Sequence, residues 1–101
     1  MTNITYKVTE NAFELHVKGH AEYVKKGERG HDVVCAAISI LVQTLAIRLE
    51  DVTDKYTTHI EPGDVEITGE GIRAVDTFWT VFTGLKALSD SYPENVKMGA
   101  L

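Results

Sequence analysis

Several features are scarce in this sequence, and each scarcity excludes a class of protein. The 101 residues include one cysteine, Cys35, so a disulfide framework within the chain is excluded and thiol redox chemistry lacks a resolving cysteine. No uninterrupted apolar run reaches the roughly 18 residues typical of a membrane span. The N-terminus "MTNITYKV" lacks a basic region followed by an apolar stretch, so no secretory signal is expected. These absences predict a cytoplasmic protein without a membrane partner.

Basic residues are also in the minority. Ten Lys and Arg face fifteen Asp and Glu, which gives a formal net charge of −5. Proteins that bind phosphate backbones normally carry a basic face, so nucleic acid is not an expected partner. An acidic surface suits a basic partner better. The length and the 44% apolar content are typical of one globular domain, which we place at residues 1–101.

Two kinds of periodicity alternate along the chain. Residues 4–8 and 12–18 alternate apolar and polar side chains around a turn, and residues 56–71 repeat this pattern around Pro62-Gly63-Asp64. Each hairpin is followed by a helical pattern, at residues 32–51 and 73–93, and residues 94–101 form a tail or a short final strand. The sequence predicts an α/β (α+β) fold, a two-layer ββαββα(β) domain with two helices and a largely antiparallel sheet.

The first predicted helix is unusually apolar. Its polar side chains form only a narrow strip, composed of Ser39, Gln43, Thr44 and Arg48. A helix with so little polar surface needs cover on nearly every side. One domain of this length can hardly supply that cover, so we expect a homodimer.

Cys35 lies in the first turn of this helix if Asp32 is the N-cap. Asp is a favoured N-cap residue, and a sulfur at a helix N-terminus lies among free backbone N–H groups, which favour the thiolate. Those N–H groups are also candidates to stabilise an oxyanion. The small neighbours Ala36 and Ala37 leave room for a substrate. Taken alone, a single cysteine is more often a small buried hydrophobe.

A nucleophilic cysteine needs a proton acceptor, and two histidines are candidates. His31 is next to the predicted cap, where a positive imidazolium is disfavoured, so it is the weaker candidate. His20 follows the second strand between Gly19 and Ala21 and is well placed to face the start of the helix. Taken alone, either histidine is more often an ordinary surface side chain.

A metal site is an alternative use of the same residues. His16, His20, His31 and Cys35 read as H-x3-H…H-x3-C. Four residues of strand span about 13 Å, however, and two ligands of one zinc ion lie much closer together. Only a sharp bend at Gly19 would allow the site, so we expect no metal and no other cofactor.

The motif "GHA" and the later "G-x-D-V-V-C-A-A-x-S" together resemble the ribosomal-processing cysteine protease family, often called Prp. The resemblance extends over nearly the whole chain, with "PGDVEI" and "GLKALSDSYPENV" also similar. It implies a small homodimeric cysteine endopeptidase from a bacterium or a phage-infected bacterial cell. It also implies a protein substrate, because members remove a short N-terminal extension from a large-subunit ribosomal protein.

The resemblance assigns roles to matching residues. It implies that His20 and Cys35 are catalytic, and it places Gly19, Ala21, Asp32 and Ser39 at other positions of the motifs. Residues 22–31 are a candidate lid, because Gly27 and Gly30 permit movement and closure would exclude water.

One feature departs from the family pattern. Fifteen positions separate His20 from Cys35, a few more than is typical of the family, and "EYVKKGERGH" looks extended. This longer segment puts the identity of the substrate in doubt more than the catalytic chemistry. An alternative stays open, namely a homodimeric binding module of the same fold with lost or altered activity.

Overall fold

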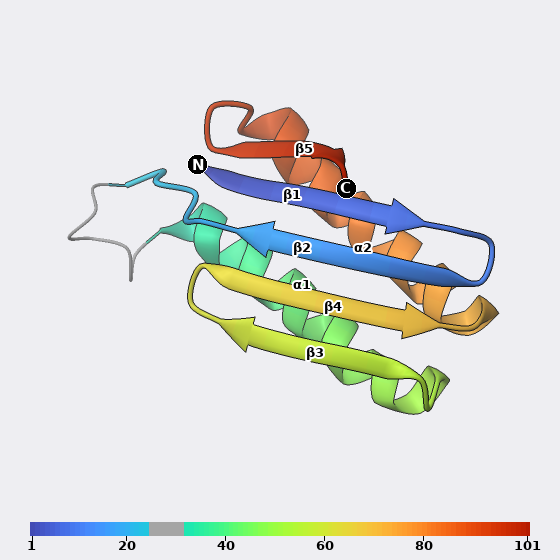
Figure 1. Cartoon of the computed structure of the whole chain (residues 1–101). Helices are drawn as coiled ribbons and strands as arrows, with labels where there is room; N and C mark the ends of the chain where they lie inside the picture. Colours follow the sequence, from blue (N-terminus) through green and yellow to red (C-terminus); the bar gives the residue numbers. More distant parts are fainter. Residues whose placement is uncertain (25–31) are drawn as a thin grey trace.

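The computed structural model describes residues 1–24 and 32–101 (Figure 1). The elements follow the predicted order, with the C-terminal segment forming a strand. They are β1 (Thr2–Val8), β2 (Ala12–Lys18), α1 (Val33–Val52), β3 (Tyr56–Glu61), β4 (Asp64–Glu70), α2 (Ile72–Ser91) and β5 (Val96–Ala100).

The strands form one sheet in the order β3-β4-β2-β1-β5. The β1–β2, β2–β4 and β3–β4 pairs are antiparallel, and β5 runs parallel to β1. The β2–β4 pair places Lys18 opposite Asp64 and so brings the end of β2 beside the turn between β3 and β4. The predicted two-layer architecture with a largely antiparallel sheet is confirmed.

Both helices cover the same face of the sheet, as Figure 1 shows. Side-chain alternation places Phe13, Leu15 and Val17 of β2 on this face, where all three are buried. Val65 and Ile67 of β4 are buried on the same face. The core therefore lies between one sheet face and two helices, as the alternating pattern requires.

Helix α1 is covered on one side only. It buries Val34, Ile38, Val42, Leu45 and Leu49. By length and composition alone, it is long and apolar enough to cross a membrane, and core helices of soluble proteins pass the same test. Its uninterrupted apolar runs are too short to reveal this property. As the sequence predicted, one domain does not cover the helix fully: exposed apolar side chains recur at intervals of seven residues, namely Val33 (60% exposed), Ile40 (62%) and Ile47 (66%).

The two helices approach each other closely at Gly84 of α2. A Cβ atom at this position would lie 2.9 Å from Cδ2 of Leu41 on α1. Glycine inside a helix costs about 1 kcal/mol relative to alanine, so its presence here is explained by the close contact.

Candidate active site

His20 is held from one side by the turn between β3 and β4. The N–H of Gly19 donates to the carbonyl oxygen of Gly63 at 2.9 Å and fastens the end of β2 to this turn. Gly63 has a φ of +71°, and a Cβ atom there would lie 2.9 Å from Nε2 of His20. The turn thus packs its backbone directly against the imidazole, which only a glycine permits. The sequence marked Gly63 as a turn residue but gave no sign of this contact.

Cys35 lies in the first turn of α1, and its sulfur contacts the residue that follows His20. Sγ accepts a hydrogen bond from the backbone N–H of Ala21 at 3.3 Å. Ala21 is fully buried, and Cys35 is half-buried. The fold therefore brings together two motifs that are fifteen residues apart. Within the described part of the chain, no hydrogen bond joins the imidazole of His20 directly to Sγ, and such contacts often tighten only when substrate binds.

His20 and Cys35 open into one pocket of about 350 Å³. It lies between the end of β2, the first half of α1 and the turn between β3 and β4. Ser39 lies at the pocket one turn after Cys35, and its Oγ accepts a hydrogen bond from Nε2 of Gln43 at 2.7 Å. The apolar part of the wall consists of Ile38, Val42, Ile60, Pro62 and Val65.

Asp32 is the N-cap of α1, as predicted, and the residue is only 2% exposed. Oδ1 accepts from the N–H groups of Val34 and Cys35, both at 3.0 Å. Oδ2 accepts from the N–H groups of Tyr23 at 2.9 Å and Val24 at 3.4 Å. One carboxylate therefore joins the start of α1 to the segment that follows His20.

Two opposing effects set the pKa of Asp32. Burial acts to raise the pKa, because it disfavours the charged form, but the four backbone donors together outweigh it. The pKa of Asp32 consequently lies below its ordinary value.

The same hydrogen bonds occupy backbone N–H groups that the sequence suggested as stabilisers of an oxyanion. The N–H groups of Val34 and Cys35 donate to the Asp32 side chain, and that of Ala36 donates to the Asp32 carbonyl at 3.0 Å. These three amides are occupied within the protein. They are not free to stabilise a substrate oxyanion, contrary to the sequence-based expectation.

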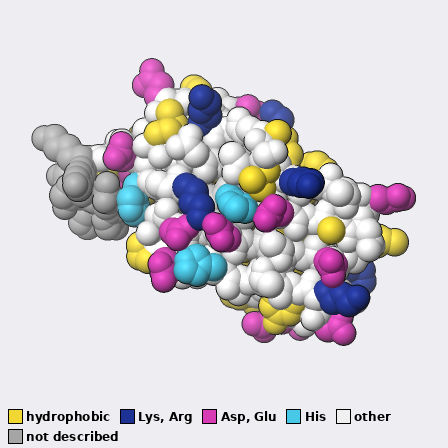
Figure 2. Space-filling model, in the orientation of Figure 1, with side chains coloured by type: hydrophobic (Ala, Val, Ile, Leu, Met, Phe, Trp, Pro, Cys, Tyr) yellow, Lys and Arg dark blue, Asp and Glu magenta, His cyan; other side chains and the backbone are white. Residues whose placement is uncertain are grey.

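The outer face of the sheet carries a separate network of charges near the β3–β4 turn (Figure 2). Lys18 donates to both Asp64 and Glu66. These hydrogen bonds raise the pKa of Lys18 and lower the pKa values of Asp64 and Glu66. His16 lies beside Glu66, with Nδ1 3.6 Å from Oε1. His16 thus belongs to the outer face, whereas Cys35 lies on the helical side, so the structure does not bring together the metal site considered above.

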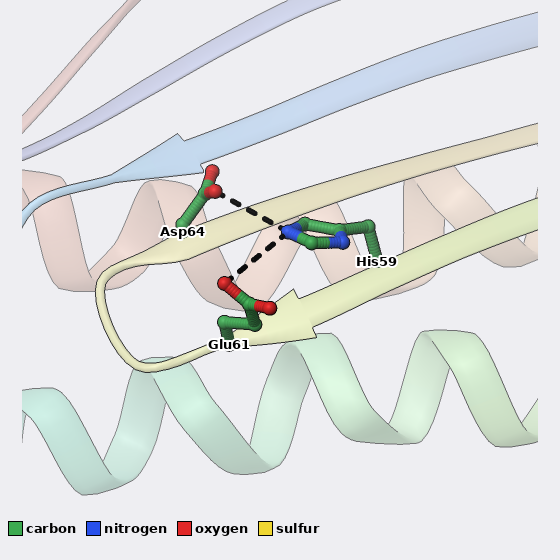
Figure 3. Close-up of side chains that lie close together, drawn as sticks. All are labelled: His59, Glu61 and Asp64. Carbon is green, nitrogen blue, oxygen red and sulfur yellow. Dashed lines mark hydrogen bonds and ion pairs between the residues drawn. The ribbon is translucent and has the colours of Figure 1, made fainter.

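Three side chains of this network, His59, Glu61 and Asp64, are of the types that bind metal ions. Nε2 of His59 lies 3.3 Å from Oδ2 of Asp64 and 3.7 Å from Oε2 of Glu61, as Figure 3 shows. One ligand atom from each residue lies within 4.8 Å of the others. Asp64 also accepts a hydrogen bond from the Lys18 ammonium, whose positive charge opposes a cation at the same carboxylate. The three residues are explained as part of the ion-pair network.

Some of the residues selected from the sequence are outside the described ranges. Gly27, Gly30 and His31 are among them, as is most of the candidate lid. The expectations placed on these residues remain predictions.

Solved structures with the same fold include a ribosomal processing protease and a protein whose name gives no activity. An essential ribosomal processing protease, Prp, from S. aureus matches over 100% of both chains at 17% identity. The TM-score is 0.80 for its complex with a covalently linked product peptide and 0.75 for its complex with a substrate peptide. The Streptococcus mutans protein SMU.848 matches at 23% identity and a TM-score of 0.70, over 100% of this chain and 94% of its own. No curated protein matches the sequence.

A half-buried cysteine and a histidine that line one pocket are the groups that a small cysteine protease needs. The sequence pattern of the cysteine protease Prp family matches residues 1–97. The chain belongs to this family, and the resemblance seen in the sequence is confirmed.

Replacing Asp32 should destabilise the fold in a pH-dependent way. The folded-state pKa is lowered, so the carboxylate stabilises the fold above its unfolded pKa of about 3.9, and this contribution is lost as the pH falls through the folded-state value. We expect Asp32→Ala to lower the free energy of unfolding by about 1–3 kcal/mol at pH 7, because it removes a cap and leaves buried N–H groups unpaired.

Urea unfolding from about pH 3 to pH 7 measures this effect. Asp32→Asn should show a smaller loss of stability than the wild type as the pH falls through the acidic range. Asp54→Asn, at an exposed position, is the matched control and should follow the wild type. Equal pH dependence in wild type and Asp32→Asn would contradict the assignment.

Proposed function

We propose that this protein is a cysteine endopeptidase in which Cys35 is the nucleophile and His20 the general base. Its proposed substrate is a basic ribosomal protein, from which it removes a short N-terminal extension. The observation that carries the proposal is that both side chains open into one pocket, with the amide next to His20 bonded to the Cys35 sulfur. The S. aureus protein of the same fold, a ribosomal processing protease seen with peptides, supports the choice of substrate.

The proposed reaction is two successive displacements at one carbonyl carbon. His20 accepts the Sγ proton, and the thiolate forms a C–S bond to the scissile carbonyl carbon. The C–N bond then breaks, and His20 returns its proton to the departing amine, which leaves a thioester on Cys35. His20 next removes a proton from water, the hydroxide adds to the thioester, and the C–S bond breaks to release the acid and restore the thiol.

The walls of the pocket suggest how the substrate is selected. Ile38, Val42 and Ile60 offer apolar contacts to side chains beside the scissile bond, whereas few charged groups line the pocket. The net charge of −5 favours encounter with a basic protein without defining the cleavage site. Apolar residues next to the scissile bond in a basic substrate are the expected combination.

Cleavage of a synthetic peptide tests the proposal most directly. The peptide would span the junction between an N-terminal extension and the mature start of a large-subunit ribosomal protein. Cys35→Ala should abolish cleavage, and His20→Ala should lower kcat by roughly 10²- to 10⁴-fold, the usual range for loss of a general base. Mass spectrometry of the products measures both effects.

His16→Ala is the matched control for His20→Ala, because His16 lies on the outer face of the sheet. It should cleave at the wild-type rate. Peptide binding without any cleavage by the wild type would favour a binding module over a protease.

Gly63→Ala should impair catalysis by displacing His20. The added Cβ would lie 2.9 Å from Nε2, and the φ of +71° adds backbone strain. Displacements of about 1 Å can cost on the order of 10²-fold in rate, so we expect kcat/KM to fall at least tenfold. Gly71→Ala is the control for strain, since φ is +114° there and the added Cβ meets only Oγ1 of Thr53 at 3.9 Å. Equal loss of activity in the two variants, at equal stability, would contradict a specific effect on His20.

We also propose that the protein is a homodimer through the outer face of its helices. Ile40 and Ile47 of α1 are exposed by 62% and 66%, and Ile72 and Trp79 of α2 by 75% and 44%. Each pair is separated by seven residues, so its members lie on one side of their helix. Exposed apolar side chains arranged in this way are typical of an interface between proteins.

Sedimentation velocity at micromolar concentration tests this assembly. The wild type should sediment as a dimer, and the double variant Ile40→Lys with Ile47→Lys should sediment as a folded monomer. Asn3→Lys adds a charge at an exposed position of β1, on the sheet face opposite the helices, and should remain dimeric. A monomeric wild type would exclude the proposal.

A further inference from the structure

The four residues after His20 are held by an unusual number of polar contacts. The N–H of Ala21 donates to Sγ of Cys35, and the N–H groups of Tyr23 and Val24 donate to Asp32. Between them, Glu22 has a φ of +56°, so the chain reverses sharply here. The carbonyl oxygen of Ala21 accepts a hydrogen bond from Nδ2 of Asn95 at 3.0 Å. Asn95 thus holds the residue whose N–H reaches the sulfur.

Asn95 is itself held firmly in place. It lies between α2 and β5, 74 residues from Ala21 in the sequence. Its N–H donates to the carbonyl of Tyr92 at 2.9 Å, and its carbonyl accepts from the N–H of Thr2 at 2.8 Å. Because these backbone contacts fix the residue from both sides, its side-chain amide is presented to Ala21 from a rigid part of the fold.

The hydrogen bond from Ala21 to Sγ matters because neighbouring backbone donors are already used by another acceptor. The amides of Val34 and Cys35 at the start of α1 are used by the Asp32 carboxylate and are not available to the sulfur. The hydrogen bond that the structure gives Sγ comes from Ala21. A donor to sulfur favours the thiolate, because hydrogen bonds to a charged acceptor are stronger than those to a neutral one.

We propose that Asn95 is a positioning residue for the nucleophile. By holding the Ala21 carbonyl, it keeps the Ala21 N–H directed at Sγ and so maintains the thiolate on which the reaction depends. This inference rests on the proposed function in one respect, that Cys35 is the nucleophile. Asn95 touches neither substrate nor sulfur and acts only through Ala21.

The test is the rate at which iodoacetamide alkylates Cys35, the only thiol, as a function of pH. Asn95→Asp keeps the shape but replaces the donor by a carboxylate, and Asn95→Ala removes the side chain. At pH 6.5 we expect both variants to label about 3- to 10-fold more slowly than the wild type, as the loss of one charge-assisted hydrogen bond implies. Near pH 9.5, where the thiol ionises in every variant, the rates should converge.

Two features separate this effect from simple damage to the fold. A disordered or more accessible site would change the labelling rate at every pH, whereas a loss of thiolate stabilisation changes it only at lower pH. Asn11→Asp is the matched control for the added charge, since Asn11 is exposed in the turn at the far end of the sheet. Among residues 1–24 and 32–101, the titratable groups that face the sulfur or its helix turn are His20, Asp32 and Glu61, and none of them is altered.

The outcomes distinguish this inference from the proposed function. If the wild type cleaves the peptide but both Asn95 variants label as it does at pH 6.5, the positioning role is wrong and the protease assignment stands. If labelling depends on Asn95 as described but the wild type cleaves no peptide, Asn95 positions the thiol and the proposed function fails. In an active enzyme, the Asn95 variants should lower kcat with little change in KM.

Discussion

The geometry of the candidate site depends on one buried carboxylate. Asp32 accepts hydrogen bonds from two amides at the start of α1 and from two amides of the segment after His20. These donors keep the carboxyl ionised despite its burial, because they replace the water that it loses. The helix that carries Cys35 and the strand end that carries His20 therefore meet at a fixed point. The Ala21 contact to the sulfur lies beside this joint.

This joint also explains how two motifs separated by fifteen positions form one site. Fifteen positions separate His20 from Cys35, yet Tyr23 and Val24 on one side and Val34 and Cys35 on the other converge on the same carboxylate. Chain length between two fastened ends has little influence on the relative position of those ends. A longer connection can therefore change the surroundings of the pocket while its central geometry is kept.

The network of charged side chains and the pocket lie on opposite faces of the sheet. Strand alternation sends Lys18, Asp64 and Glu66 to the outer face, where they pair with each other, and sends Val17 and Val65 toward the helices and the pocket. The pocket consequently has apolar walls in a protein that is acidic overall. The outer sides of the helices also carry exposed apolar side chains, Ile40, Ile47, Ile72 and Trp79, on which the proposed dimer rests.

The sequence by itself determined the order of elements, the two-layer fold, the cap at Asp32 and the family, because these follow from local periodicity, capping chemistry and two short motifs. Only the tertiary structure decided that the Asp32 cap also accepts from the N–H groups of Tyr23 and Val24 and so joins α1 to the segment after His20. It alone placed Gly63 against His20 and Asn95 against Ala21. Such contacts join residues far apart in the chain, and neither periodicity nor local propensity carries information about them.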